Sequence, residues 1–152
     1  RAYDERITLT PGGAQLVATM KKFGAHTCLV SGGFSFFVER IGARLGFHET
    51  ASNVLLAENG TLTGQVREPI LGRAAKLEKL EALIASLGID AEQALALGDG
   101  ANDLAMIERA GLGVAFHPHA ILAAHADAVI RHSTLKAVLY IQGYRADEIV
   151  AA

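Results

Sequence analysis

The segment Gly98-Asp99-Gly100-Ala101-Asn102-Asp103 combines two glycines, two carboxylates and an amide. Glycines let a backbone approach an anion closely, and the N-terminus of a following helix favours negative charge. A carboxylate at the same place can hold Mg²⁺, which prefers oxygen ligands. This segment could therefore bind a phosphate group and a magnesium ion, although an ordinary polar turn between a strand and a helix is the alternative.

A second segment, Ser31-Gly32-Gly33, follows the short apolar run of residues 26–30. A hydroxyl followed by flexible glycine amides can donate several hydrogen bonds to one phosphate group. A glycine turn capped by serine would look the same in isolation. The presence of two anion-binding junctions in one chain favours the functional interpretation.

Lys76 is the third candidate, because it extends the apolar stripe of a helix expected over 72–87. Leu80, Leu83, Ile84 and Leu87 form that stripe. A lysine near a helix N-terminus on an inward face is opposed by desolvation and by the helix dipole. We therefore expect an anionic partner for Lys76, with a lysine reaching solvent at the rim of the domain as the alternative.

Strands and helices must position these residues. Residues 94–97 are apolar without alternation, which is typical of a parallel strand covered on both faces. Leu104, Met106 and Ile107 have helical spacing, and Gly111 is the expected stop. Asp99 and Asp103 would then lie at the carboxyl end of a strand, where open α/β sheets bind ligands.

Further elements follow from periodicity and capping residues. Thr10 and Pro11 predict a helix start, and Gly24 predicts its end. Asn59-Gly60 predicts an antiparallel hairpin at the sheet edge between residues 53–58 and 61–66. The expected inward side chains of the two N-terminal helices are Leu16, Val17, Met20 and Phe23, then Phe37, Val38, Ile41 and Leu45. The remaining expected elements are strands over 26–30, 112–116 and 128–130 and helices over 34–45, 119–126 and 135–141.

Length and composition limit the class of protein. The 152 residues, 51% of them hydrophobic, suffice for a single domain over 1–152 with a real core. The net charge of −2 without a basic block gives no reason to expect nucleic acid or an anionic membrane as partner. No apolar run reaches membrane-spanning length and no signal peptide is visible, which counts against a cation pump.

The potential soft metal ligands predict no zinc site. Cys28 is the single cysteine and lies in an apolar segment, so we expect a buried thiol in a reducing, cytoplasmic setting. His117 and His119 flank Pro118, and no third soft ligand stands at an obvious spacing. Zinc is therefore rejected, and the two histidines are interpreted as a solvated turn.

The motif at residues 98–103 resembles the last motif of the haloacid dehalogenase superfamily of Mg²⁺-dependent phosphotransferases. Together with Ser31-Gly32-Gly33-Phe34, the Asn59-Gly60 hairpin and Lys76, it resembles the phosphoserine phosphatase family over residues 10–141 in unbroken order. The resemblance implies a Rossmann-like α/β fold, with a parallel sheet, helices on both faces and an edge hairpin.

The resemblance also implies roles for residues. Ser31, Gly32 and Gly33 would bind the phosphate, and Asn102 would orient it. Lys76 would neutralise the phosphate, Asp99 would ligate Mg²⁺, and Asp103 would hold Lys76, which makes Lys76 and Asp103 the catalytic candidates. The implied reaction is hydrolysis of O-phospho-L-serine to L-serine and phosphate, the last step of serine biosynthesis.

One part of the family pattern is absent from this chain. The family uses an Asp-x-Asp-x-Thr motif whose first aspartate attacks phosphorus and whose second is the general acid and base. No two aspartates here stand two positions apart; they are Asp4, Asp90, Asp99, Asp103, Asp127 and Asp147. We therefore expect that the chain alone is inactive and that the nucleophile, the first strand and most of the cap are missing.

We expect the first strand to lie between the strands ending at Val30 and Leu97, supplied in cis or in trans. Residues 1–10 would be the last piece of the cap. The chain is then a fragment or a partly observed protein, and its oligomeric state is left open, with an oligomer as one option. Two alternatives remain: a phosphatase of the same superfamily for another small phosphomonoester, and a non-catalytic phosphate-binding or scaffold fragment.

Overall fold

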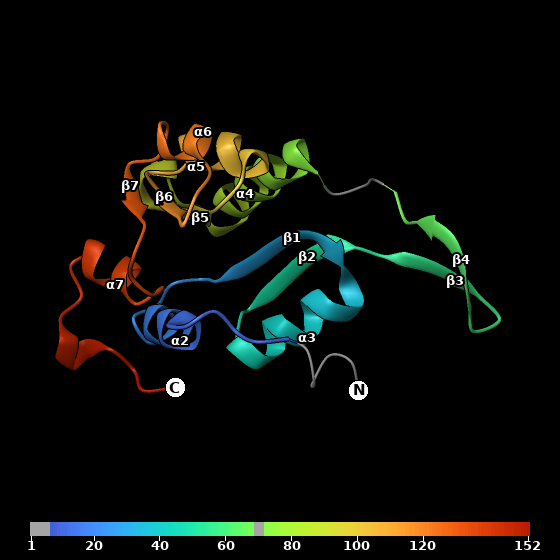
Figure 1. The fold of residues 1–152 in the computed structure, drawn as a ribbon, viewed down its shortest axis with the longest axis horizontal. Coiled ribbons are helices and arrows are strands. Elements are labelled where there is room, and N and C mark those ends of the chain that lie inside the picture. Colours follow the sequence, from blue (N-terminus) through green and yellow to red (C-terminus); the bar gives the residue numbers. More distant parts are fainter. Residues whose placement is uncertain (1–6, 69–71) are drawn as a thin grey trace. The chain divides into compact units, whose positions relative to one another are not determined.

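The computed structural model describes residues 7–68 and 72–152, which divide into two compact units (Figure 1). Of these residues, unit 1 comprises 7–68 and 134–152, and unit 2 comprises 72–133. The single-domain prediction over 1–152 stays a prediction. The expected end of a cap at 1–10 lies largely outside the described residues.

Unit 1 is built around a strand–helix–strand motif. Strands β1 (Cys28–Phe34) and β2 (Glu49–Asn53) pair in parallel, and helix α3 (Ser35–Leu45) connects them and contacts both. Gly42 is buried on α3, where an added Cβ would collide with the Thr50 side chain. The glycine therefore lets the helix approach the sheet closely.

The predicted hairpin is confirmed. Strands β3 (Leu55–Glu58) and β4 (Thr61–Val66) are antiparallel. Asn59 and Gly60 both have positive φ, 51° and 79°, as a two-residue hairpin turn requires. Within the described residues the pair forms a separate two-stranded sheet, so its expected place at the edge of the parallel sheet is wrong. Asn53 belongs to β2 instead of the hairpin, and β2 itself was not predicted.

The helices α2 (Gly13–Lys22) and α7 (Ala137–Ile141) contribute the buried apolar residues Leu16, Val17, Val138 and Leu139 to unit 1. The N–H of Leu135 donates to the Pro11 carbonyl, 3.0 Å away. The buried Thr19 hydroxyl accepts from the N–H of Val150 at 2.9 Å. The C-terminal segment is thus tied to α2. It also contains a 3-10 turn, η3 (Ala146–Glu148).

Unit 2 is a parallel α/β layer. Strands β5 (Leu95–Gly98), β6 (Leu112–Phe116) and β7 (Ala128–Ile130) pair in that order, which confirms the predicted parallel sheet. Helix α5 (Leu104–Arg109) contacts β5 and β6, and α4 (Arg73–Leu87) contacts α5. Shorter pieces are η1 (Ala91–Gln93), η2 (Ala101–Asp103) and α6 (Ala120–Ala123).

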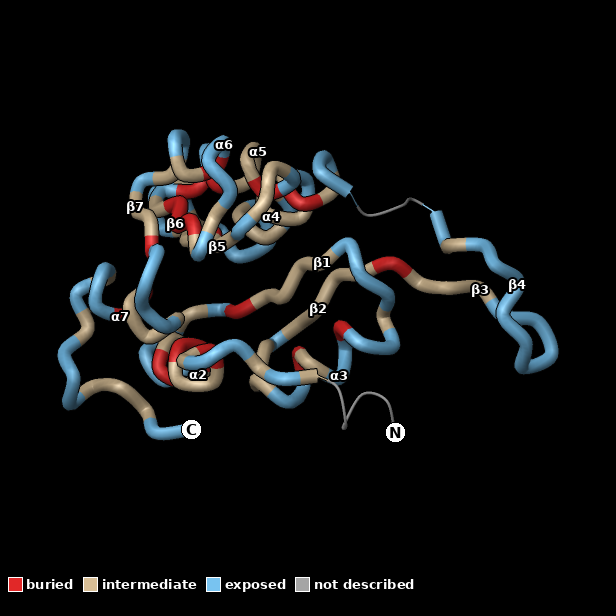
Figure 2. Tube along the Cα trace, viewed as in Figure 1, coloured by how far each residue is buried: buried red, intermediate tan, exposed pale blue. Residues whose placement is uncertain are grey.

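The core of unit 2 lies on one face of β5. Ala96, Ile107, Ala110, Ala115 and Leu122 form a buried cluster. Leu95 and Leu97 point to the opposite face, because successive side chains of a strand alternate. Both are only partly buried (Figure 2). Val114, the β6 partner of Leu97 on that face, is fully buried, so within the described residues β5 is covered on one face and partly covered on the other.

Several predicted boundaries differ. Helix α2 starts at Gly13, not at Pro11, because Gly12 adopts a left-handed conformation (φ 85°). Strand β1 starts at Cys28 and continues through Ser31 to Phe34, with a register shift after Val30. Helices α6 and α7 are shorter than expected.

Some side chains expected inside are exposed. Phe23 is 48% exposed and packs its ring against Tyr144, Phe37 is 40% exposed, and Leu87 is 44% exposed. Cys28 is half-buried and forms no disulfide, so the expected buried thiol is wrong. Gly111 is not a left-handed stop: an added Cβ would strike the backbone of Glu92. Within the described residues, no helix combines the length and apolarity needed to cross a membrane.

Candidate active site

A buried ion pair between Lys76 and Asp103 forms the centre of the candidate site. Lys76 is the single buried residue of α4, at 8% exposure, and Asp103 is 4% exposed. The Lys76 Nζ donates to Asp103 Oδ1 at 2.6 Å. A charge out of water requires such a partner, so the expected anionic compensation is present. The alternative of a lysine reaching solvent at the rim is wrong.

The other oxygen of Asp103 holds the turn that follows β5. Asp103 Oδ2 accepts the N–H of Asp99 at 3.1 Å and the N–H of Gly100 at 3.3 Å. A Cβ at Gly98 would lie 2.5 Å from the Asp103 side chain. Glycine at 98 therefore lets the carboxylate fold back over the turn. Through its two oxygens, Asp103 joins α4 to the end of β5.

Asp99 has the position expected of a metal ligand. It directly follows β5 at the carboxyl edge of the sheet and is exposed. Its carbonyl accepts the N–H of His119 at 3.2 Å. Among the described residues its carboxylate has no hydrogen-bond or ion-pair partner. Both carboxylate oxygens thus remain available to a hard cation.

Asn102 lies in η2 and is exposed. Its Oδ1 would be 3.0 Å from a Cβ added at Gly100, so Gly100 leaves room for the amide. Arg73, which sequence reasoning missed, donates from Nη2 to the Ala101 carbonyl at 3.2 Å. This contact ties the first turn of α4 to η2. The signal available in the sequence was a second cationic residue at the start of the helix that contains Lys76.

Ser31, Gly32 and Gly33 belong to unit 1, so their union with Lys76 in one site stays a prediction. They lie within β1 rather than after it. The Ser31 Oγ accepts the N–H of Gly33 at 3.0 Å, which leaves the hydroxyl proton available. Buried Asn53 donates from Nδ2 to the Gly32 carbonyl at 2.9 Å. Asn53 was not predicted as a site residue. The signal available for it was an amide side chain at the end of a strand.

The loop after β6 lies at the same edge of the unit 2 sheet as Asp99. His117 has a positive φ of 43°, and its ring stacks on Phe116 with centroids 4.0 Å apart. The His117 Nε2 lies 3.0 Å from the Ser133 carbonyl. Sequence reasoning treated this histidine as part of a solvated turn. It is exposed but held on two sides.

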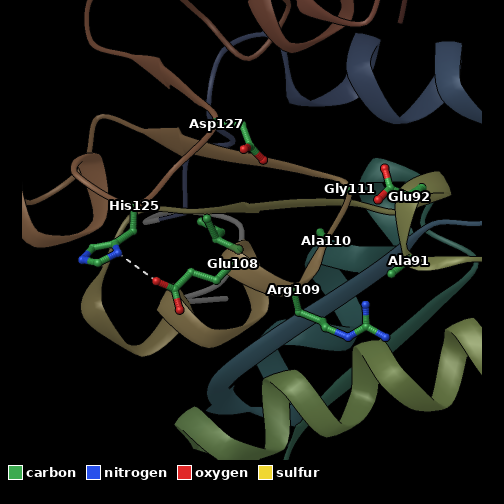
Figure 3. Close-up of a pocket in the computed structure, with 9 residues that line it drawn as sticks. Ala91, Glu92, Glu108, Arg109, Ala110, Gly111, His125 and Asp127 are labelled. Atoms are coloured by element: carbon green, nitrogen blue, oxygen red, sulfur yellow. Dashed lines mark ion pairs between the residues drawn. The ribbon is translucent and has the colours of Figure 1, made fainter.

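A cavity of about 280 Å³ lies at the opposite end of the same sheet (Figure 3). Its lining includes Glu92, Gly111 and Asp127, each just before a strand or in the turn leading to one. His125 pairs there with Glu108 at 2.8 Å. The carboxyl ends of β5 and β6, where Asp99 and His117 lie, are at the far edge. The cavity is therefore separate from the candidate site.

The described residues contain no group of three or more His, Cys, Asp or Glu side chains that could hold a metal ion. Asp99 can consequently be only one member of a ligand set.

Comparisons with known proteins identify the family and the fold. The family model for haloacid dehalogenase-like hydrolases matches residues 1–108. The chain therefore belongs to the haloacid dehalogenase-like hydrolase family, and the α/β fold is that of solved phosphoserine phosphatase structures.

Its curated relatives are named phosphoserine phosphatase. The protein from Albidiferax ferrireducens is 51% identical over 119 residues, covering 76% of this chain and 50% of the relative. The probable phosphoserine phosphatase from Vibrio cholerae, solved in unliganded form, has a TM-score of 0.86 at 36% identity and covers 90% of this chain and 42% of that one. A phospho-aspartyl intermediate analogue of phosphoserine phosphatase has a TM-score of 0.83 at 38% identity, covering 90% and 66%. The chain spans about half the length, or less, of the first curated relatives it matches.

Proposed function

We propose that residues 1–152 are part of a Mg²⁺-dependent phosphoserine phosphatase, which hydrolyses O-phospho-L-serine to L-serine and phosphate in the last step of serine biosynthesis. The observation that carries the proposal is the buried Lys76–Asp103 pair, joined by Asp103 to the turn that presents Asp99. The 51% identity to a phosphoserine phosphatase supports the choice of substrate.

Lys76 neutralises the phosphate in this proposal. An ammonium group has three N–H donors, and Asp103 accepts one of them. The remaining donors can bind phosphate oxygens, and burial strengthens their interaction with the charge that grows in the transition state. Asp103 touches no substrate in this scheme. It positions Lys76 and the Asp99 turn.

In this proposal Ser31 and Gly32 bind the phosphate, and Gly33, whose N–H donates to the Ser31 Oγ, holds the serine hydroxyl in place. The Ser31 hydroxyl keeps its proton for a phosphate oxygen, because its own oxygen accepts from Gly33. Asn53 fixes the Gly32 carbonyl and thereby orients this stretch of β1. Asn102, exposed in η2, orients the phosphoryl group.

Asp99 is the residue that would hold Mg²⁺. Its exposed carboxylate without a partner in the described chain fits a hard cation. When bound, the ion offsets negative charge on the phosphoryl oxygens.

The attacking group lies outside this chain. In the proposed reaction an aspartate oxygen bonds to phosphorus, the bond from phosphorus to the serine oxygen breaks, and that oxygen takes a proton from a general acid. Water then attacks phosphorus and frees the aspartate. None of the six aspartates of this chain forms the Asp-x-Asp pair that this sequence of steps requires.

The test uses the longest natural reading frame that contains these residues. We expect Mg²⁺-dependent release of phosphate from O-phospho-L-serine, with weaker release from O-phospho-L-threonine and from p-nitrophenyl phosphate. Preference for another phosphomonoester would overturn the substrate assignment. No hydrolysis of any of them, with phosphate binding retained, would establish the non-catalytic alternative.

A further inference from the structure

His117 stands out among the residues of unit 2 because its backbone is in the left-handed region, with φ 43°. Among the described residues outside glycine, only His117 and the hairpin residue Asn59 have positive φ. L-residues adopt this conformation rarely, so surrounding contacts must hold it. His117 lies directly after β6, at the edge of the sheet that carries Asp99, so its conformation can affect the Asp99 turn.

Three contacts hold His117. Its N–H donates to the Ile130 carbonyl at 2.7 Å, which extends the pairing of β6 with β7. Its ring stacks on Phe116, with 16° between the ring planes. Its Nε2 lies 3.0 Å from the Ser133 carbonyl, which can only accept, so the ring proton sits on Nε2.

The turn made by His117 determines where the next residues lie. Two positions later, the N–H of His119 donates to the Asp99 carbonyl at 3.2 Å. His119 is also the N-cap residue of α6, and α6 contacts η2, the turn that contains Asn102 and Asp103. The Asp99 turn is therefore held from two sides: by the carboxylate of Asp103 and by the backbone that follows His117.

We propose that His117 is a positioning residue for the Asp99 turn. Its tethered ring and left-handed backbone direct the chain so that the N–H of His119 fixes the Asp99 carbonyl and α6 supports η2. The positioning of the Asp99 turn does not depend on the proposed function. Its consequence, that the Asp99 carboxylate is directed at the metal, does rest on the proposed function.

The first test measures amide hydrogen exchange in the longest natural reading frame that contains these residues. The probes are the N–H groups of Asp99 and Gly100, which donate to Asp103, and that of His119, which donates to Asp99. We expect His117→Ala to accelerate exchange at these amides about tenfold. His117→Gly, which adopts positive φ freely but lacks the ring, should accelerate it by a smaller factor. The matched control is His125→Ala, an exposed histidine at the opposite end of the sheet.

Unchanged exchange at the three amides in His117→Ala would overturn the proposal. Equal acceleration at amides throughout β5 and β6 would also overturn it, because His117 would then serve only the stability of unit 2. His117→Gly keeps the test valid if the alanine variant fails to fold.

The second test uses the longest natural reading frame. We expect His117→Ala to raise the Mg²⁺ concentration for half-maximal phosphatase activity roughly tenfold, as for other groups that orient a metal ligand, with little change in kcat at saturating Mg²⁺. An unchanged Mg²⁺ requirement would overturn the link to the metal. If the unsubstituted protein shows no phosphatase activity, the proposed function fails, while the exchange experiment still decides the positioning role.

Discussion

Asp103 accepts the Lys76 ammonium on one carboxylate oxygen and the amides of Asp99 and Gly100 on the other. One side chain thus connects the cation of α4 to the loop that follows β5. Because both charges are buried, removing either leaves the other without compensation. The proposed phosphate site and the local stability of unit 2 therefore depend on the same pair.

The first prediction concerns Lys76. In the longest natural reading frame, Lys76→Ala should lower kcat for O-phospho-L-serine by about 100-fold or more, the scale for one preorganised charge-stabilising group. In the same protein, this change should lower the free energy of unfolding by about 3–5 kcal/mol, because Asp103 stays buried without its cation. Steady-state kinetics and urea unfolding measure the two effects.

A double variant separates charge from packing. Lys76→Met with Asp103→Asn removes both charges, keeps a side chain of the same shape with an oxygen that can accept the Asp99 and Gly100 amides, and should recover stability relative to Lys76→Ala, while activity stays low. Near-normal turnover in Lys76→Ala would show that the lysine has only a structural role.

The second prediction concerns Asp99. In the same reading frame, Asp99→Asn should raise the Mg²⁺ requirement and lower activity together, because it removes an anionic oxygen ligand from a hard cation. Mg²⁺ titrations of activity and calorimetric titration with Mg²⁺ measure the change. The control is Asp147→Asn, an exposed carboxylate that pairs with Arg145 in unit 1. Lower activity with an unchanged Mg²⁺ requirement would refute the ligand assignment.

The third prediction concerns Gly98. Gly98→Ala places a Cβ 2.5 Å from the Asp103 side chain, so either the carboxylate or the strand must move. We expect a loss of about 1–3 kcal/mol in the free energy of unfolding of the longest natural reading frame, as for other overpacked sites. The control is Gly72→Ala, since an added Cβ at Gly72 meets nothing within 4 Å and its φ is negative. Equal stability of the two variants would contradict the close approach of Asp103 to Gly98.

The sequence was a good guide where local chemistry and packing agree. Asn59-Gly60 specifies its own turn, and the apolar run at 94–97 together with 112–116 and 128–130 predicted three parallel strands. Lys76 was recognisable as a lysine in need of an anion. Its partner Asp103 is 27 positions away, and the pairing was anticipated from family resemblance rather than from spacing.

Other features were beyond a local pattern. Helical spacing identifies a face but not whether anything covers it, so Phe37 and Leu87 were wrongly placed inside. Thr10 and Pro11 form a helix-start signal, but the left-handed backbone of Gly12 places the start of α2 at Gly13. The left-handed backbone of His117 depends on contacts with Ile130 and Ser133, far along the chain, and no short motif announces it.

The last prediction concerns the 152-residue chain by itself. It should release no phosphate from O-phospho-L-serine, because none of its aspartates stands in an Asp-x-Asp pair that could supply the nucleophile and the general acid. Within the described residues, β1 pairs only with β2, and β5 only with β6. Unpaired strand edges favour association, so size-exclusion chromatography should show oligomers or aggregates.

A separate amino-terminal fragment containing Asp-x-Asp-x-Thr should restore Mg²⁺-dependent hydrolysis and reduce the association. The same fragment with its first aspartate changed to asparagine should reduce association without restoring hydrolysis. Robust hydrolysis by the 152-residue chain alone would overturn this account, since it would require a nucleophile among the residues of this chain.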